Sequence, residues 1–394
     1  MLLTRATLAD GRRVDVRVTG DRIAVVADHL VPADGEAVVD LDGHLLLPAP
    51  AEPHAHLDKA LTADRVPNPA GDLLGAIKAW LAYRPTLTVD DIAERAERAV
   101  RMLAANGVTA IRTHVDVGVD IGTRGIEALV RTRRAVGDAV DLQIVALNSV
   151  PSTGELGAGN RAALDAAVEV GADVVGGCPH LEAEPMAAVE HALELAAAHG
   201  HPVDLHTDET LEPAMLQLPD IADFVVKTGF PHQVTASHCV SLGVQDDATQ
   251  RDVSDRVAAA GVAVVTLPQT NLYLQGRGVR TATPRGLTAI RALLDAGATV
   301  AGGADNLQDP FNIVGRGDPF ETAALLVMAG HLTADEAYHA VSAASRAAMG
   351  LEPVEVVAGA PAELVAVRAG SVREAIATAP AGRIVIHRGH LVAA

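Results

Sequence analysis

The stretch LLLPAPAEPHAHLDK, residues 45–59, joins a short apolar run to a group of polar side chains. The run Leu45–Pro48 has the length and apolar composition of a buried strand, and it leads into His54 and His56. Residues two positions apart in an extended strand point to the same face, so these two imidazoles can converge on one ion. The stretch therefore predicts a strand that delivers chemically useful side chains at its end.

The same pattern of a short, β-branched apolar run recurs along the chain. Seven further runs predict strands: Thr109–Thr113, Leu142–Leu147, Asp173–Gly176, Val203–His206, Gln233–Ser237, Val262–Leu267 and Thr299–Gly302. Segments rich in Ala, Leu and charged residues predict helices between them: Val89–Ala105, Arg124–Val136, Arg161–Val170, Ala187–His199, Asp247–Ala259 and Gly286–Leu294. Continuous apolar runs are typical of parallel strands that are covered on both faces.

Eight such units over about 300 residues predict an α/β fold of the TIM type, a (β/α)8 barrel. An open, doubly wound parallel sheet is the alternative arrangement of the same elements. That sheet normally carries a glycine-rich phosphate loop after its first strand, and the sequence has none there.

The sequences at both chain ends predict short strands separated by turns. Asp-Gly pairs at 10–11, 34–35 and 42–43 are turn signals. We expect residues 1–48 and 352–394 to pair into one small β-sandwich domain, and residues 49–351 to form the barrel.

Composition excludes several classes of protein. The formal net charge of −19 disfavours nucleic acid as a partner, because phosphate binding needs clustered Lys and Arg. Two cysteines, Cys178 and Cys239, do not make a disulfide framework, and small apolar fillers are the simpler interpretation. The first residues lack the apolar segment of a signal peptide, and no run approaches the length of a membrane span. These features predict a soluble cytoplasmic protein that acts on a small molecule without a membrane or nucleic-acid partner.

Histidine and aspartate residues stand at several predicted strand ends. His206 ends the fifth strand and Asp305 follows the eighth, while His54 and His56 follow the first. Singly, each has a plainer explanation, such as a hydrogen-bonded core histidine or a helix cap. In a barrel, however, all carboxyl strand ends meet at one face. Three imidazoles and a carboxylate suit Zn²⁺ or Fe²⁺, so these four residues predict a metal site that activates water.

The roles of three further residues near the predicted strand ends stay open, with two interpretations for each. His114 and His180, which end the second and fourth strands, are either hydrogen-bonded rim residues or groups close to the substrate. Lys59 either meets an anionic group of a substrate or forms a surface salt bridge, and the salt bridge is slightly favoured.

Motifs along nearly the whole chain resemble the amidohydrolase superfamily, in its cytosine deaminase-like branch with the related triazine-degrading aminohydrolases. They are EPHAHLD (52–58), RTHVD (112–116), DLQIVA (141–146), GADVVG (171–176), DLHTDE (204–209), VTASH (234–238) and LQGR (274–277). The resemblance implies a distorted (β/α)8 barrel with a small β-sandwich built from both chain ends. Relatives are often homo-oligomers, so the resemblance also allows an oligomer here.

The resemblance also implies roles for individual residues. His54, His56, His206 and Asp305 match the ligands of a single divalent metal, Zn²⁺ or Fe²⁺. Glu209 matches the carboxylate that shuttles a proton to the ring and the leaving group. His238 matches the histidine that holds the attacking water, and Asp305 would take the proton of that water. One metal is implied because Cys178-Pro179-His180 stands where binuclear relatives carry a carboxylated lysine.

The residues that would contact the substrate depart from the family pattern. Ser149 stands where cytosine deaminases carry a glutamine that reads the pyrimidine edge, and serine cannot make the same two contacts. Asn306 replaces a second acidic residue, and Tyr273 replaces a histidine. Phe311 matches the aromatic of the pocket wall. Gln275 matches a family position near the pocket, with a solvated loop residue as the equal alternative.

These observations predict a metal-dependent hydrolytic deaminase of a small pyrimidine- or triazine-like heterocycle, rather than of cytosine itself. The alternative within the same site is hydrolysis of another C–N bond, which would release an alkylamine or open an amide. A third possibility is a metal-binding or ligand-sensing protein without catalysis, against which Glu209 and His238 argue.

Overall fold

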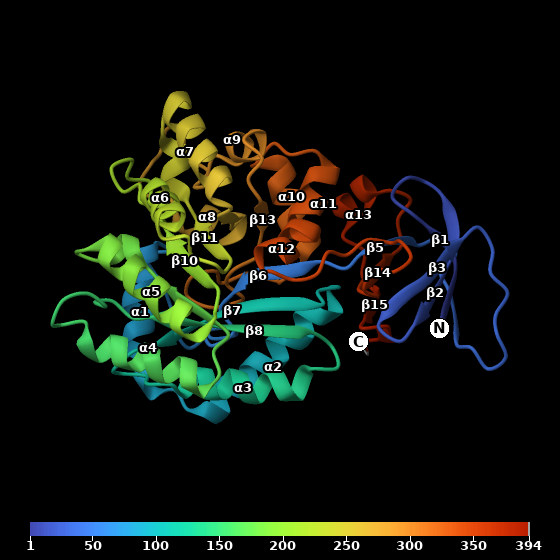
Figure 1. Cartoon of the computed structure of the whole chain (residues 1–394), viewed down its shortest axis with the longest axis horizontal. Helices are drawn as coiled ribbons and strands as arrows, with labels where there is room; N and C mark the ends of the chain where they lie inside the picture. The colour runs from blue at the N-terminus through green and yellow to red at the C-terminus, as the bar shows by residue number, and fades with distance from the viewer. Residues whose placement is uncertain (393–394) are drawn as a thin grey trace.

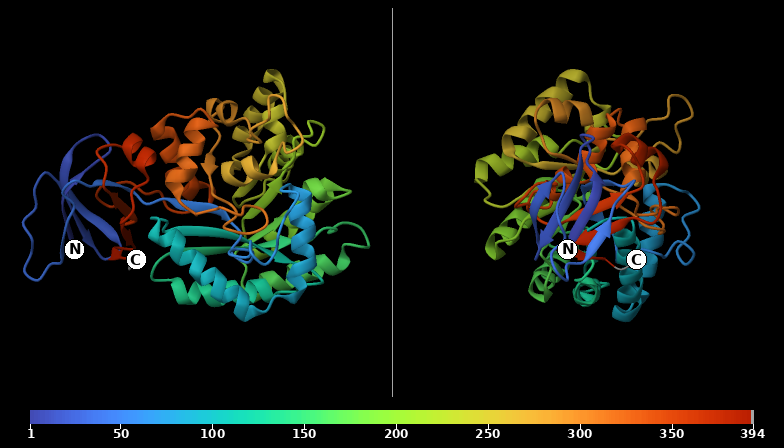
Figure 2. Two further views of the ribbon diagram at one scale, coloured as in Figure 1. Left: turned by 180° about the vertical axis from the view of Figure 1, so that it is seen from behind. Right: turned by 90° about the vertical axis from the view of Figure 1, so that its right-hand side faces the viewer.

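A barrel of parallel strands and helices makes up most of the molecule, and a separate sheet lies at one end of it (Figure 1). The structure, a computed structural model, describes residues 1–392. Segments near both chain ends contribute strands to the separate sheet (Figure 2). The predicted fold, a barrel with a separate β-structure built from both chain ends, is confirmed. The domain bounds 1–48 with 352–394 and 49–351 stay predictions, and residues 393–394 lie outside the described part.

Eight parallel strands form the barrel and follow one another in sequence order around it. They are β6 (Ala51–Ala55), β7 (Ala110–Val117), β8 (Asp141–Asn148), β9 (Val174–Gly177), β10 (Val203–Thr207), β11 (Val234–His238), β12 (Ala263–Thr266) and β13 (Val300–Gly302). A single bridge between Ala55 and Asp305 links the last strand back to the first, and the amide of Asp305 donates to the carbonyl of His54 at 3.1 Å. The predicted barrel is therefore confirmed.

The prediction was wrong about the first barrel strand. Leu45–Pro48 forms β5, which pairs antiparallel with β14 (Leu364–Val367) in the terminal sheet. The barrel begins instead at β6, Ala51–Ala55, whose polar residues do not resemble a buried strand. The apolar run and the histidines therefore belong to consecutive strands of different sheets.

The predicted helices are present, and two of them have the predicted bounds. These are α2 (Val89–Ala105) and α3 (Arg124–Val136), while α4 (Ala158–Val170), α5 (Pro185–His199) and α7 (Asp247–Ala260) begin or end up to three residues from prediction. The helix expected over Gly286–Leu294 is shorter, α9 (Ile290–Asp295), because Gly286 has a left-handed φ of +65° that a helix does not allow.

Several helices were not predicted from the sequence. They are α1 (Leu73–Tyr83), α6 (Leu218–Thr228), α8 (Pro268–Leu274), α10 (Pro319–Met328), α11 (Ala334–Val341), α12 (Ala343–Ala348) and α13 (Val372–Thr378). Of these, α1 lies across the end of the barrel that is remote from the terminal domain, as both side views show (Figures 1 and 2). It matters for function because it forms one wall of the cavity described below.

The terminal strands form one mixed sheet in the order β16-β15-β14-β5-β1-β2-β3, with β4 on β1. Their bounds are β1 (Leu2–Thr7), β2 (Arg13–Thr19), β3 (Arg22–Ala27), β4 (Val38–Asp40), β15 (Ile384–His387) and β16 (His390–Leu391). A small apolar core that includes Leu3, Val16 and Leu364 stabilises this sheet. The barrel has its own larger core, rich in Ala, Val and Leu.

A buried charge, the guanidinium of Arg112, lies inside the barrel and connects four of its strands. It donates to Asp204 at 2.9 Å and to Gln143 at 2.9 Å, and it also reaches Thr235 and the carbonyl of Ala348. Both Arg112 and Asp204 are completely buried. Burial raises the pKa of Asp204 to about 6, although the charge of Arg112 favours its ionised form.

Replacing Arg112 with methionine would leave Asp204 as a buried carboxylate without its cation. We expect Arg112→Met to lower the free energy of unfolding by about 3–5 kcal/mol. Arg65→Met is the control, because it removes only a half-exposed pair with Asp91 and should cost less than about 1 kcal/mol. Urea denaturation followed by circular dichroism measures both changes, and equal midpoints for the two variants would contradict this role of Arg112.

Candidate active site

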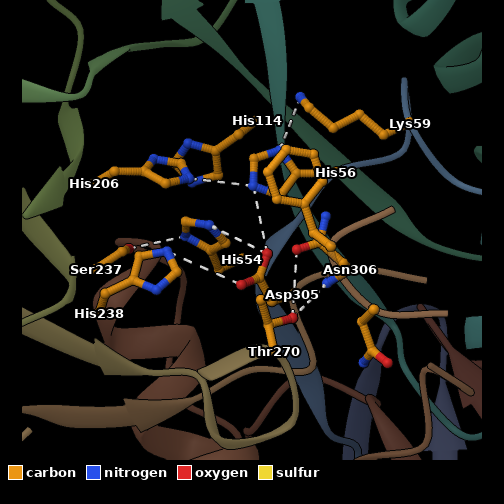
Figure 3. Close-up of polar contacts among 12 residues, drawn as sticks. His54, His56, Lys59, His114, His206, Ser237, His238, Thr270, Asp305 and Asn306 are labelled. Carbon is orange, nitrogen blue, oxygen red and sulfur yellow. Dashed lines mark hydrogen bonds and ion pairs between the residues drawn. The ribbon is translucent and has the colours of Figure 1, made fainter. Parts of the chain in front are cut away.

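The carboxyl ends of the barrel strands bring the predicted metal ligands together (Figure 3). His54 and His56 come from β6 and the residue after it, His206 from β10, and Asp305 from the segment that follows β13. All four side chains are buried. Residues far apart in the sequence thus form one cluster, as the barrel predicts.

His56 lies close to two other predicted ligands. His56 Nε2 is 3.2 Å from His206 Nε2 and 3.4 Å from Asp305 Oδ1, while His54 Nε2 is 3.8 Å from the same oxygen. Ligand atoms about 2.0–2.1 Å from a tetrahedral zinc lie about 3.3 Å from one another. The two His56 distances therefore match shared ligation of one small cation, and the three imidazoles could hold such an ion together.

Some atoms of the cluster are buried without a hydrogen bond in the described part of the chain, whereas His56 Nε2 and His206 Nε2 contact each other. Within residues 1–392, His54 Nε2 and both carboxylate oxygens of Asp305 are buried without a hydrogen-bond partner. A buried polar atom without a partner is costly, so several in one place indicate a missing ligand. Burial, followed by the neighbouring imidazoles, lowers the pKa of His54 well below its usual value, so the ring is neutral and able to bind a metal.

Hydrogen bonds behind His54 fix which ring nitrogen faces the cluster. The hydroxyl of Ser237 donates its only proton to Asp204 at 2.9 Å. The 2.9 Å contact between His54 Nδ1 and Ser237 Oγ must then be donated by the imidazole. His54 Nε2 consequently keeps its lone pair for a metal, and the chain Arg112–Asp204–Ser237–His54 ties this ligand to the buried ion pair.

Glu52 is a structural residue of the site that sequence reasoning missed. Its carboxylate accepts the backbone amides of His54 at 3.1 Å and Ala304 at 2.9 Å, so it links β6 to the segment that carries Asp305. Burial raises the pKa of Glu52 to about 8. Its position two residues before the first histidine was a signal, since a glutamate inside a strand needs buried partners.

Two site residues have left-handed backbone. His238 has φ +71° and Asp305 has φ +65°, although neither is glycine. Such conformations cost about 1–3 kcal/mol each and persist where the surrounding structure enforces them. They aim both side chains toward the cluster.

Glu209 and His238 lie beside the predicted metal ligands, and burial shifts the pKa values of the two side chains in opposite directions. Glu209 Oε1 is 3.6 Å from His238 Nδ1, and His238 Nε2 is 4.0 Å from Asp305 Oδ2. Burial raises the pKa of Glu209 to about 8, so its carboxyl group is protonated at neutral pH. Burial lowers the pKa of His238 to about 3, and Asn271 Oδ1, which lies 3.1 Å from Nδ1, orients its ring. Asn271 was also missed from the sequence.

One cavity opens above this cluster and holds about 810 Å³ of atom-free space, part of which is open to solvent. Of the predicted substrate-binding residues, Ser149, Asn306, Phe311 and Lys59 line it, together with Glu209 and His238. The side chains of Trp80, Arg84 and Asp116 also line it and were not singled out from the sequence.

Lys59 forms a buried salt bridge rather than a surface one. Its ammonium group lies 2.7 Å from Asp116 and 3.3 Å from Asp58, and its side chain is about as buried as the metal ligands. Burial opposes the charge, but the two carboxylates outweigh it and raise the pKa of Lys59. Its charge is thus compensated within the protein.

The hydroxyl of Ser149 is held by Arg84, whose Nη2 donates to it at 3.0 Å. Arg84 belongs to a short 3₁₀ helix, residues Arg84–Thr86, and also bonds Asp116 and Asp120. Since Ser149 accepts this bond, its own proton remains available to a ligand. No periodic pattern marked Arg84 in the sequence.

Asn306 lines the cavity, but both ends of its amide also bond the protein, at Thr270 and Asp309. The two remaining predicted substrate-binding residues do not line the cavity. Gln275 does not line the cavity; its amide donates to the backbone of Glu209 at 3.3 Å. His114 does not line it either, because its ring stacks behind that of His54 with centroids 3.9 Å apart. The suggestion that His114 faces the substrate is therefore not borne out by its position.

His180, the other histidine with two interpretations, is hydrogen-bonded rather than directed at the cavity. Its Nδ1 donates to the carbonyl of His206 at 3.0 Å, and its ring is buried. It supports the backbone of β10 beside a metal ligand.

The hydrogen bond from His54 to Ser237 should matter for metal affinity. We expect Ser237→Ala to weaken metal binding about 10–100-fold, because ring orientation and basicity depend on such supporting bonds. Chelator competition followed by elemental analysis measures this change. Ser254→Ala is the matched control, because Ser254 is equally buried but its hydroxyl has no partner among residues 1–392. Equal metal retention by both variants would remove Ser237 from the site.

A family model described as the amidohydrolase family matches residues 81–393. The chain belongs to this family, a class of enzymes that hydrolyse non-peptide C–N bonds. It is 33% identical over 382 residues to a pterin deaminase from Rhizobium rhizogenes, which covers 93% of this chain and 87% of the relative.

Two solved structures share the whole fold. The 5-methylcytosine deaminase from Klebsiella pneumoniae, liganded with 5-fluorocytosine, has a TM-score of 0.91 and 29% identity over 100% of this chain and 97% of the other. The N-isopropylammelide isopropylaminohydrolase from Burkholderia multivorans has a TM-score of 0.86 and 30% identity over 99% of this chain and 97% of the other. Among residues 1–392, no helix is long and apolar enough to cross a bilayer.

Proposed function

We propose that the protein is a metal-dependent hydrolytic deaminase of a small pyrimidine- or triazine-like heterocycle. The observation that carries this proposal is the position of Glu209, a buried carboxyl group that lines one cavity together with His56, His206, His238 and Asp305. Burial raises its pKa to about 8, which suits a proton donor near neutral pH. The similarity to a pterin deaminase and to a 5-methylcytosine deaminase supports it. A cytoplasmic location and a homo-oligomer remain predictions beside it.

His54, His56, His206 and Asp305 would hold one divalent metal, Zn²⁺ or Fe²⁺. Imidazole nitrogens with a carboxylate suit both metals. His54 Nε2 and both carboxylate oxygens of Asp305, which have no hydrogen-bond partner within residues 1–392, are free to bind an ion. When bound, such a metal lowers the pKa of water toward neutrality, so that water becomes a nucleophile.

The surrounding residues would handle the protons of the reaction. His238 Nε2 keeps a lone pair because Nδ1 donates to Asn271, so it can accept a hydrogen bond from the attacking water. Asp305 takes the proton released as the new C–O bond forms. Glu209 donates its proton to the ring nitrogen, then takes the proton of the hydroxyl group on the adduct and passes it to the amine, which leaves as ammonia when the C–N bond breaks and the C=O bond forms. The proton held by Asp305 then returns to Glu209.

Specificity would come from the other side of the cavity. Ser149 offers one hydroxyl proton and Phe311 an apolar face, while Asn306 has only one amide proton that is not committed to the protein. These three side chains do not include a glutamine, whose amide could donate one hydrogen bond and accept another at the edge of a cytosine ring. We therefore place cytosine below other ring amines as a substrate.

A second candidate reaction is the release of an alkylamine from the same kind of ring. The similarity to an N-isopropylammelide isopropylaminohydrolase favours it, and Glu209 could protonate an alkylamine as well as ammonia. A protein that binds metal without catalysis is less favoured, because it would have no use for a protonated carboxyl group beside the ligands.

Removing the proton of Glu209 tests its role directly. We expect Glu209→Gln to lower kcat about 10²–10⁴-fold, because an amide cannot donate and recover a proton. Its metal content, measured by elemental analysis, should be unchanged. Glu212→Gln changes an exposed neighbour in the same loop and should leave kcat unaltered. Full activity of Glu209→Gln would show that another group protonates the leaving amine.

A panel of ring amines tests the reaction itself. We expect the metal-loaded protein to release ammonia from at least one of 5-methylcytosine, ammelide and pterin, with kcat/KM about tenfold or more above that for cytosine. Ammonia and isopropylamine are quantified separately, with N-isopropylammelide included. Isopropylamine as the sole amine would establish the second candidate, and release of neither amine would refute both.

A further inference from the structure

Helix α1 turns one stripe of its surface toward the cavity. The residues of this segment that line the cavity are Leu73, Ile77, Trp80 and Leu81, followed by Arg84. Their spacings of three and four place them on one helical face. Leu74 lies on the same helix but outside the cavity, and it is 63% exposed.

Apolar side chains face this stripe from other parts of the barrel mouth. Val150, which follows β8, Leu181 and Phe311 all line the same cavity. Leu81, Val150 and Leu181 are between 40% and 45% exposed, which is unusual for large aliphatic side chains brought together at one opening. Apolar groups gathered in this way mark a binding surface.

The polar side chains on the α1 side of the cavity, Trp80 and Arg84, already have hydrogen-bond partners within the protein. The carboxylate of Asp116 accepts Trp80 Nε1 at 2.7 Å, Arg84 Nη1 at 3.0 Å and Lys59 Nζ at 2.7 Å. These bonds fix the α1 side of the cavity to Asp116 near the end of β7. Lys59 connects Asp116 to the cluster, because its Nζ also lies 3.3 Å from His56 Nδ1. What the wall offers to a ligand is chiefly its aliphatic surface.

The lining of the cavity also extends beyond the metal cluster. It runs from His56, His206 and Asp305 to the exposed side chains of Leu81, Val150 and Leu181. A six-membered heterocycle bound at the metal cluster would leave these outer side chains in contact with water. Displacement of that water by an apolar group is favourable.

We propose that Leu73, Ile77, Leu81, Val150, Leu181 and Phe311 form an apolar subsite for an alkyl or aryl substituent of the heterocycle. This inference rests on the proposed deaminase function, and it places the substituent on the ring edge remote from the amine that is hydrolysed. The metal cluster and Glu209 act on the ring, and the apolar subsite selects what the ring carries.

The test uses the ring of the panel with the highest kcat/KM, either unsubstituted or with a methyl, propyl or phenyl group on the remote edge. Each buried methylene contributes about fourfold in affinity. We expect the propyl compound to exceed the unsubstituted ring about tenfold or more in kcat/KM, through a lower KM with little change in kcat. The double variant Ile77→Ser, Leu81→Ser should bring this ratio close to one, and Leu74→Ser should preserve it.

The possible outcomes separate the two proposals. Turnover of the unsubstituted ring without any preference for the propyl or phenyl compound would overturn the apolar subsite and leave the deaminase function standing. Release of no ammonia from any ring would overturn the deaminase function and the subsite with it. A change of oligomer size in the double variant with an unchanged ratio would assign the stripe to a subunit interface instead. Should the double variant fail to fold by circular dichroism, Leu181→Ser tests the opposite wall.

Discussion

The buried ion pair between Arg112 and Asp204 is the constraint on which the site depends. Because it is buried, its donors and acceptors depend on partners inside the barrel, which Nε and Nη1 of Arg112 have but Nη2 lacks among residues 1–392. Asp204 meets this need through Arg112 on one side and Ser237 on the other. Because Ser237 has only one proton to give, the ring of His54 is forced to donate, and its other nitrogen must face the cluster. A requirement of barrel stability thus selects the ligand-competent form of a site residue.

The cluster itself is held at a cost. His238 and Asp305 have strained backbone, and several inward-facing atoms have no partner within residues 1–392. A cation that binds only the folded chain would meet these atoms and stabilise the fold by mass action. Glu52 helps to hold the cluster together although it is not one of the predicted ligands. Its carboxylate joins the segment of His54 to the segment that precedes Asp305. Function and stability are therefore coupled through the same few buried groups.

The sequence was informative where side chains are fixed by strand geometry. Alternating or continuous apolar runs located most strands, and His206, His238 and Asp305 follow those runs directly, so their convergence could be predicted. It failed at Leu45–Pro48, because a buried strand of the terminal sheet and a buried strand of the barrel have the same composition. The first barrel strand, Ala51–Ala55, could not be recognised from its composition, because it contains Glu52 and His54. The partners that allow these polar residues to be buried lie far away in the sequence.

The residues that shape the cavity opening escaped prediction for a different reason. Trp80 lies on α1 and Arg84 on the short 3₁₀ helix that follows, between β6 and β7. They meet Asp116 and Ser149 only because the barrel brings these segments together. Nothing in local spacing encodes such a contact. Chemistry at the strand ends and selectivity in the connecting segments therefore respond to different constraints. The barrel strands must keep their register with one another for the strand ends to meet. In contrast, the apolar residues of α1 can change while the hydrogen bonds to Asp116 are kept. A change of substrate is thus structurally easier in this barrel than a change of reaction.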